Sequence, residues 1–356
     1  MHKKLFIPGP VEILPEVLEQ MAKPMIGHRG KEASALQRRI SDKLRTVFAT
    51  KEEILLSTSS GSGLMEGALR SCTTKRAVVF SIGAFGDRWY DMAVDNGVPA
   101  DFITSEWGQP TTPEMVDKAL MTGNYDLVTI THSETSTGVM NNLEELAPVI
   151  RKYPDVVYCV DAVSSMGGTP IYSDRDGVDI CITSTQKALG LPPGMACCSF
   201  SKKAIERAKQ VKTRGSYFDL LKLYDCIQDS DYQYPTTPSL SHMFALEYQL
   251  DRMLAEGLEN RFARHKEMAG AVQDWAARHF AIFANPAYLS DTVTAIVNTK
   301  GLSVVDLNKV LGERGFQISN GYGKVKDKTF RIAHMADCTL PEVKELLAVV
   351  EDVLKL

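Results

Sequence analysis

The stretch VDICITSTQKAL, residues 178–189, is an apolar run that changes to small polar residues and then reaches Lys187. A second stretch, VVYCVDAVSS at residues 156–165, is apolar until it reaches Asp161. Both runs are short and do not alternate with polar residues, which is typical of strands covered on both faces of a sheet. The sequence therefore predicts two buried strands that carry ionisable side chains at or just beyond their carboxyl ends.

Strand-like and helix-like segments alternate through the first two thirds of the chain. The predicted strands are Ile54–Ser57, Ala77–Ser81, Leu127–Thr131, Val156–Val160, Ile180–Thr183 and Ala196–Phe200, and the predicted helices are Gly63–Cys72, Arg88–Asn96, Pro113–Met121 and Leu143–Lys152. Such alternation predicts an α/β fold with a mainly parallel sheet flanked by helices. Ligands of these sheets bind beyond the carboxyl ends of the strands, where Asp161 and Lys187 fall.

The pattern changes after about Pro238. A long helical stretch from Ser241 to Phe280, with an expected break near Gly257, is followed by a strand at 292–298, a helix at 304–314, a strand at 329–333 and a helix at 341–354. We interpret this region as a smaller α+β domain. The expected organisation is an N-terminal segment (1–20) that contributes to the active site and the small domain, a large domain (21–245) and a small C-terminal domain (246–356).

The composition excludes several function classes. The 356 residues are 44% hydrophobic and 24% charged, with a net charge of -4, which gives no general attraction to nucleic acid or to an anionic membrane. No apolar stretch approaches the length of a membrane span, and the N-terminal MHKKLFIPGP does not resemble a signal peptide. The seven cysteines form no metal-ligand pattern, so we expect no metal and a reduced, cytoplasmic setting.

The pairing of Asp161 with Lys187 suits one cofactor, pyridoxal 5'-phosphate. A lysine can form a Schiff base with its aldehyde, and a carboxylate can keep its pyridine nitrogen protonated so that the ring accepts electrons. Singly, such residues are more often a solvated surface group or a cap. Three further motifs in order along the chain strengthen the hypothesis: STSSGSG at 57–63, GAFGDR at 83–88 and ETSTG at 134–138.

These motifs offer a phosphate cradle, an aromatic surface and a hydroxyl group. The segment Ser60-Gly61-Ser62 lies at the expected start of a helix, where free backbone N–H groups favour an anion. Phe85 can lie flat on a planar ring, and Thr135 can hydrogen-bond a phenolic oxygen of the cofactor. A plain loop, a core aromatic residue and a capped turn would explain the same residues singly. The cradle matches neither the nucleoside-triphosphate nor the dinucleotide fingerprint.

Together the motifs resemble those of the class V, fold-type I pyridoxal-phosphate aminotransferases of the alanine–glyoxylate and serine–pyruvate group. The resemblance runs from the Pro-Gly-Pro at 8–10 to Arg331 and includes VDAVSS at 160–165, QKA at 186–188 and PPG at 192–194. It implies a ping-pong transamination between a small amino acid, of the alanine, serine or aspartate type, and a small 2-oxo acid, glyoxylate or pyruvate.

The resemblance also implies a role for individual residues. Lys187 would carry the cofactor and move the proton, and Asp161 would pair with the ring nitrogen. Arg331 would bind the substrate α-carboxylate through its planar fork, with Gly9 close to the substrate. The other cofactor contacts would come from Ser60, Gly61, Ser62, Phe85, Thr135, Val163, Gln186, Tyr234 and Thr237. Of these, the tyrosine and Thr237 would reach the cofactor of the neighbouring subunit in a homodimer.

Several alternatives stay open. The 2-aminoethylphosphonate and phosphoserine aminotransferases share most of these motifs, and pyridoxal-phosphate lyases and cysteine desulfurases have the same fold. A desulfurase needs a nucleophilic cysteine on a mobile loop, and Cys338 is the only C-terminal cysteine. The intact Lys187, Asp161 and Arg331 argue against a non-catalytic relative, and a nicotinamide-dependent oxidoreductase would lack its glycine fingerprint.

Donor and acceptor are also open at this point. Two residues near the expected entrance bear on that choice: Arg29 as a partner for a second acidic group, and Tyr322 as a residue that narrows or polarises the entrance.

Overall fold

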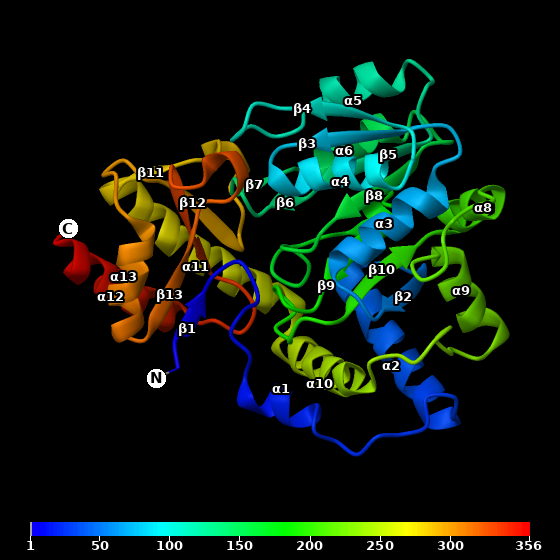
Figure 1. The fold of residues 1–356 in the computed structure, drawn as a ribbon, viewed down its shortest axis with the longest axis horizontal. Coiled ribbons are helices and arrows are strands. Elements are labelled where there is room, and N and C mark those ends of the chain that lie inside the picture. Colours follow the sequence, from blue (N-terminus) through cyan, green and yellow to red (C-terminus); the bar gives the residue numbers. More distant parts are fainter. Residues whose placement is uncertain (1) are drawn as a thin grey trace.

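The computed structural model describes residues 2–356, which contain two main β-sheets (Figure 1). The larger sheet has the strand order β2-β10-β9-β8-β5-β3-β4. Its strands are β2 (Glu53–Ser57), β3 (Ala77–Ser81), β4 (Ala100–Thr104), β5 (Leu127–Thr131), β8 (Val157–Asp161), β9 (Ile180–Ser184) and β10 (Ala196–Phe200). All neighbouring strands from β9 to β4 are parallel, and only β10 is antiparallel to its neighbours β9 and β2. The predicted α/β fold with a mainly parallel sheet is confirmed.

Helices cover both faces of this sheet. They are α2 (Lys31–Phe48), α3 (Gly61–Cys72), α4 (Ala84–Asp95), α5 (Pro113–Leu120), α6 (Leu143–Ile150), α7 (Ser173–Asp176), α8 (Lys202–Gln210), α9 (Leu220–Asp229) and α10 (Leu240–Glu256). Val78 and Phe80 of β3 belong to the core under α2, α5, α6 and α10, whereas Ala77 and Val79 belong to the core under α3, α4, α8 and α9. Both faces are therefore buried, which explains why the strands are apolar without alternation.

The smaller sheet has the order β1-β13-β14-β12-β11. Its strands are β1 (Lys4–Phe6), β11 (Ala281–Ile282), β12 (Val293–Val297), β13 (Phe316–Asn320) and β14 (Thr329–Ala333), and its helices are α11 (Leu258–His279), α12 (Val304–Glu313) and α13 (Leu340–Leu354). The expected helix break is confirmed, since α10 ends at Glu256 and α11 begins at Leu258 around Gly257 with a φ of 83°. The domain boundaries at residues 20/21 and 245/246 stay a prediction.

Short elements complete the chain. They are α1 (Pro15–Gln20), the hairpin of β6 (Ser133–Glu134) and β7 (Val139–Met140), and the 3-10 turns η1 (Pro286–Tyr288) and η2 (Gly323–Val325). The sequence patterns did not predict α1, α2, α8, α9, β1, β4 or β13. Helix α4 begins at Ala84, one turn earlier than predicted, because the buried carboxylate of Glu134 accepts hydrogen bonds from the first-turn amides of Phe85 and Gly86. Within residues 2–356, no helix is both long and apolar enough for a membrane span.

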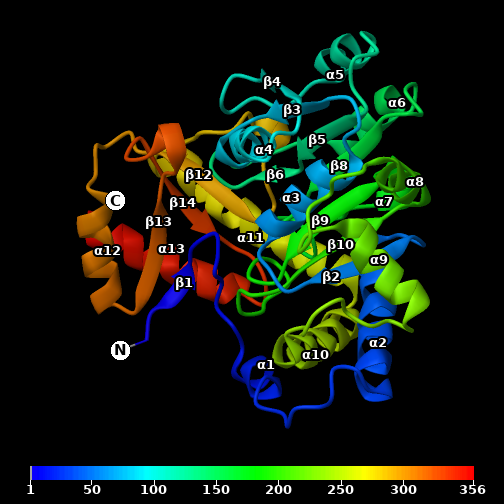
Figure 2. The same ribbon diagram turned by 45° about the vertical axis from the view of Figure 1, so that its right-hand side comes forward.

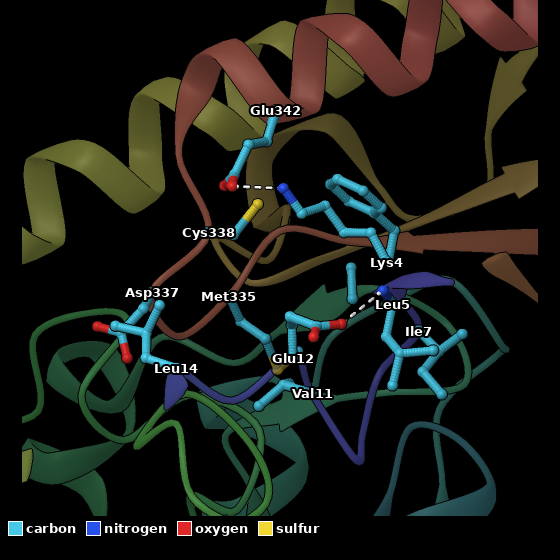
Figure 3. A pocket seen from close by; sticks show the side chains of 12 residues that line it. Lys4, Leu5, Ile7, Val11, Glu12, Leu14, Met335, Asp337, Cys338 and Glu342 are labelled. Atoms are coloured by element: carbon cyan, nitrogen blue, oxygen red, sulfur yellow. Dashed lines mark hydrogen bonds and ion pairs between the residues drawn. The ribbon is translucent and has the colours of Figure 1, made fainter. Parts of the chain in front are cut away.

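The N-terminal segment links the two sheets. Strand β1 pairs in parallel with β13, and further along the segment α1 lies against α10. Figure 3 shows how the segment is anchored: the Lys4 ammonium donates to Glu342 at 2.5 Å, and the Leu5 amide donates to Glu12 at 3.1 Å. Between these contacts, the backbone at residues 8–10 passes the end of β9.

Arg261 on α11 is 1% exposed and joins several distant segments. In Figures 1 and 2 this helix extends from the small sheet toward the large one. The Arg261 guanidinium donates to the carbonyls of Gly167 at 3.0 Å and Ala188 at 2.9 Å, and it pairs with Glu256 at 2.8 Å and Asp337 at 3.2 Å. A buried charge is tolerated only with such a full set of partners.

Replacing Arg261 by methionine should lower the free energy of unfolding by about 3–5 kcal/mol, because buried carboxylate and carbonyl groups lose their partner. Chemical denaturation followed by tryptophan fluorescence measures the change. Arg278→Met is the matched control, since Arg278 is exposed on the same helix; its effect should stay within about 0.5 kcal/mol. Equal losses in the two variants would contradict the role given to Arg261.

Candidate active site

A cavity of about 380 Å³ lies at the carboxyl ends of β8 and β9, where the N-terminal segment and the small sheet meet the large sheet. Most of the predicted site residues line it: Gly9, Ser60, Gly61, Ser62, Phe85, Thr135, Asp161, Val163, Gln186, Lys187 and Arg331. Tyr234 and Thr237 do not line it. Residues from five separate regions of the sequence thus converge on one space, as expected for the carboxyl edge of a parallel sheet.

Lys187 carries the reactive amine of the cavity. Its side chain is almost fully buried, and its ammonium donates a hydrogen bond to the carbonyl of Pro8. Burial, together with the nearby positive charge of Arg331, lowers the pKa of Lys187 to about 8, although Asp161 acts in the opposite direction. An amine with this pKa is partly neutral near physiological pH, and the neutral amine is the form that attacks a carbonyl carbon.

Asp161 is the last residue of β8 and is 4% exposed. Burial raises the pKa of Asp161 to about 6, and a hydrogen bond of 2.9 Å from the Val163 amide works against this rise. The carboxylate is therefore ionised at neutral pH but poorly solvated. Such a group can pair with a protonated ring nitrogen, which would replace its missing hydration.

An anion can be held at the start of α3. The helix begins at Gly61 after Ser60, and no side chain caps its free N-terminal amides. A Cβ atom at Gly61 would lie 2.6 Å from Cγ2 of Val163, so only glycine fits there. Nearby, Oγ of Ser184 and Oε1 of Gln186 are buried without a hydrogen-bond partner among the described residues. These polar atoms are suited to a ligand with phosphate oxygens.

Aromatic and guanidinium groups form the wall toward the small sheet. The rings of Phe85 and Tyr322 stack with centroids 5.6 Å apart and an interplanar angle of 16°. Nε of Arg331 donates to the Asn320 carbonyl at 2.9 Å, and Nη1 donates to the Thr135 carbonyl at 3.1 Å. These bonds fix the guanidinium and leave Nη2 for a ligand. The Thr135 hydroxyl itself lies 2.6 Å from that of Ser164.

Tyr234 and Thr237 have other surroundings in this chain. Tyr234 is buried, and its hydroxyl accepts a hydrogen bond of 3.1 Å from the amide of Thr58, close to the start of α3. Thr237 is exposed. The Arg29 guanidinium donates to the carbonyls of Tyr234 and Pro235 and does not line the cavity, so the hypothesis that it meets a second acidic group is not supported.

The sequence reasoning assigned no role to Arg88, which also lines the cavity. Arg88 belongs to the GAFGDR motif, and it follows Phe85 by three residues on α4. Residues at that spacing share a helix face, so the sequence did contain a signal that the two side chains lie together.

Cys338 lies outside the site. It lines a separate cavity behind β1, together with Lys4, Glu12 and Met335 (Figure 3). Burial raises the pKa of the Cys338 thiol to about 12, so it is protonated at neutral pH and a poor nucleophile. Both its position and its protonation state argue against a desulfurase.

Comparisons with known proteins give a consistent picture. The sequence model of the family Aminotransferase class-V matches residues 11–336. An uncharacterized aminotransferase of Methanocaldococcus jannaschii is 37% identical, covering 100% of this chain and 93% of its own. The L-aspartate–glyoxylate aminotransferase of Paracoccus denitrificans is 30% identical, covering 94% and 87%. The crystal structure of alanine–glyoxylate aminotransferase from Nostoc sp. has a TM-score of 0.94 and 26% identity, covering 99% of this chain and 96% of that one.

The pH dependence of Lys187 can be measured without a cofactor. Reductive trapping with a small aldehyde and borohydride, followed by peptide mass spectrometry, reports the neutral amine. Because the pKa of Lys187 is lowered to about 8, its labelling should rise as the pH increases through 8. An exposed lysine, with a pKa of about 10.4, should not reach its plateau until well above that. A rise of Lys187 labelling centred above pH 10 would contradict the lowered pKa.

Gly9→Ala should displace the Lys187 side chain. A Cβ at Gly9, where φ is +99°, would lie 2.7 Å from Cδ and 2.9 Å from Cε of Lys187. We expect trapping of Lys187 to slow by about 10- to 100-fold, since small misplacements of a reacting group cost this much. Gly97→Ala controls for the positive φ, because Gly97 has a φ of +66° and open space around its Cβ position. Unchanged trapping in Gly9→Ala would show that the backbone does not confine the amine.

Proposed function

The chain belongs to the class-V aminotransferases, and we propose that it uses pyridoxal 5'-phosphate to transfer the amino group of a small amino acid to glyoxylate or pyruvate. The observation that carries the proposal is the buried pair of Lys187, with its pKa lowered to about 8, and Asp161, both lining one cavity with Arg331. The names of the Paracoccus denitrificans and Nostoc relatives support glyoxylate as an acceptor. Donors of the alanine, serine or aspartate type fit the same names.

The residues of the cavity fit this cofactor. Its phosphate would be held by Ser60, Gly61 and Ser62 at the N-terminus of α3, with the partnerless polar atoms of Ser184 and Gln186 close by. Phe85 and Val163 would lie on opposite faces of its ring, and the hydroxyl of Thr135 would meet its phenolic oxygen. When bound, the cofactor supplies an electron sink for the electrons released at the substrate α-carbon.

The chain's own residues supply orientation and proton transfer. Arg331 holds the substrate α-carboxylate in a bidentate fork, which fixes the α-carbon near Lys187. The Lys187 amine takes the α-proton from the donor and, in the second half-reaction, gives a proton to the α-carbon derived from the acceptor. Asp161 keeps a proton on the ring nitrogen. Because donor and acceptor use the same cavity in turn, the kinetics are ping-pong.

We further propose a cytoplasmic homodimer. Tyr234 and Thr237 do not line the cavity of their own chain, which supports a role at the cofactor of a neighbouring subunit. All seven cysteines are free thiols, which supports a reducing compartment.

The absorbance spectrum of the purified protein tests the proposed function. We expect a yellow band that one amino acid from a panel bleaches, and that glyoxylate or pyruvate then restores. A band that no amino acid shifts would favour a lyase or a phosphonate donor. A protein that gives no band even after addition of pyridoxal phosphate would overturn the proposal.

Lys187→Ala should reduce turnover by at least about 10⁴-fold, because covalent attachment and proton transfer are both lost. Single-turnover absorbance with the best donor measures this. Lys118→Ala is the control, since Lys118 is exposed on α5. Turnover in Lys187→Ala within tenfold of the control would mean that another base does the chemistry.

A further inference from the structure

Arg88 presents a second guanidinium group to the cavity, besides Arg331. It is half-buried on α4, and its Cζ lies 4.7 Å from the centroid of the Phe85 ring. Its Nη2 donates a hydrogen bond of 3.2 Å to the Tyr322 hydroxyl. The aromatic face and the phenol aim the guanidinium, but neither of them neutralises its charge.

Within residues 2–356, no carboxylate pairs with Arg88. Its neighbour Asp87 accepts from the Ser81 hydroxyl at 2.6 Å and lies 3.4 Å from the Lys324 ammonium. The buried Glu134 accepts from the amides at the start of α4 and from Ser136. Nε and Nη1 of Arg88 are therefore left without a protein acceptor in the described part of the chain.

Tyr322 brings the two guanidinium groups into one cluster. Its ring stacks on Phe85, and Cζ of Arg331 lies 5.7 Å from its centroid. Tyr322 is 41% exposed and lines the cavity, so this cluster meets solvent. Two like charges on one aromatic pair repel each other unless anions bind between or beside them. The substrate α-carboxylate would neutralise Arg331 and leave Arg88 for a second anion.

We propose that Arg88 binds the side-chain carboxylate of a dicarboxylic amino donor, so that the preferred donor is an aspartate-like amino acid. This inference rests on the proposed function and narrows it. A planar guanidinium with two adjacent N–H groups free matches a carboxylate in a bidentate fork. A phosphate group would require more donors, and the nearby first-turn amides of α4 are already taken by Glu134 and Ser136.

The test compares Arg88→Gln with the parent holoenzyme. We expect the ratio of kcat/KM for aspartate to kcat/KM for alanine to fall about 30-fold, as for loss of one charge-assisted pair. Tyr322→Phe, which removes only the hydroxyl that aims Arg88, should lower the same ratio by about threefold. Arg278→Gln on α11 is the control and should leave the ratio unchanged.

A binding measurement gives a second readout that does not require turnover. Succinate should bind the parent holoenzyme at least about tenfold more tightly than propionate in calorimetric titrations, and Arg88→Gln should abolish that preference. If Arg88 instead balances the cofactor phosphate, its replacement will weaken pyridoxal-phosphate binding and leave the succinate preference intact, which overturns the proposal.

Two other outcomes would also overturn it. One is an equal loss of kcat/KM for aspartate and alanine in Arg88→Gln. The other is a dependence on Arg88 for O-phosphoserine but not for aspartate. Failure of the proposed transamination would look different: no amino acid would bleach the cofactor band of the parent, while the comparison of succinate with propionate would still report on Arg88.

Discussion

The buried guanidinium of Arg261 determines where the loop after β9 lies. Its acceptors come from the segment after β8, from the loop after β9, from the end of α10 and from the segment after β14. A charge in the interior must keep all its partners, so these four segments have to meet at one point. Ala188, one of the acceptors, directly follows Lys187. The position of the reactive amine is thus a consequence of how the two sheets are joined.

Burial acts on the two central ionisable groups in opposite directions. It lowers the pKa of Lys187 to about 8 and raises the pKa of Asp161 to about 6, because each group loses water that would stabilise its charged form. The two values approach each other and bracket neutral pH. A site with this property can exchange protons without a large energy gap between donor and acceptor. The same burial requires close walls, and the backbone at Gly9 provides one of them, since no side chain fits between it and Lys187.

Features that depend on neighbouring residues were predictable from the sequence. The buried strands β3, β5, β8, β9 and β10 were recognised because both of their faces are apolar. Strand β4, at the edge of the sheet, was missed because none of its residues is fully buried. Helix α2 was missed because its stripe of Leu36, Ile40 and Leu44 lies among charged residues.

The candidate site follows the same rule. Asp161, Lys187 and the α3 cradle follow strands directly, so their convergence on one cavity could be expected, whereas the roles of the residues there stay predictions. Arg88 and Tyr322 are far apart in the sequence and meet only through the packing of the small sheet on the large one. Arg261 could not be recognised, because a buried arginine looks like any other charge in a helix rich in charged residues.

The pairing of β1 with β13 has a consequence for the order of events during synthesis. A ribosome releases β1 first, yet its partner strand is among the last segments to emerge. Until then the first strand has no neighbour in the small sheet, and the backbone at Gly9 is not held over Lys187. The large sheet can form earlier, since all its strands precede residue 201. The reactive amine is therefore enclosed only near the end of translation, when the chain closes on itself across its full length.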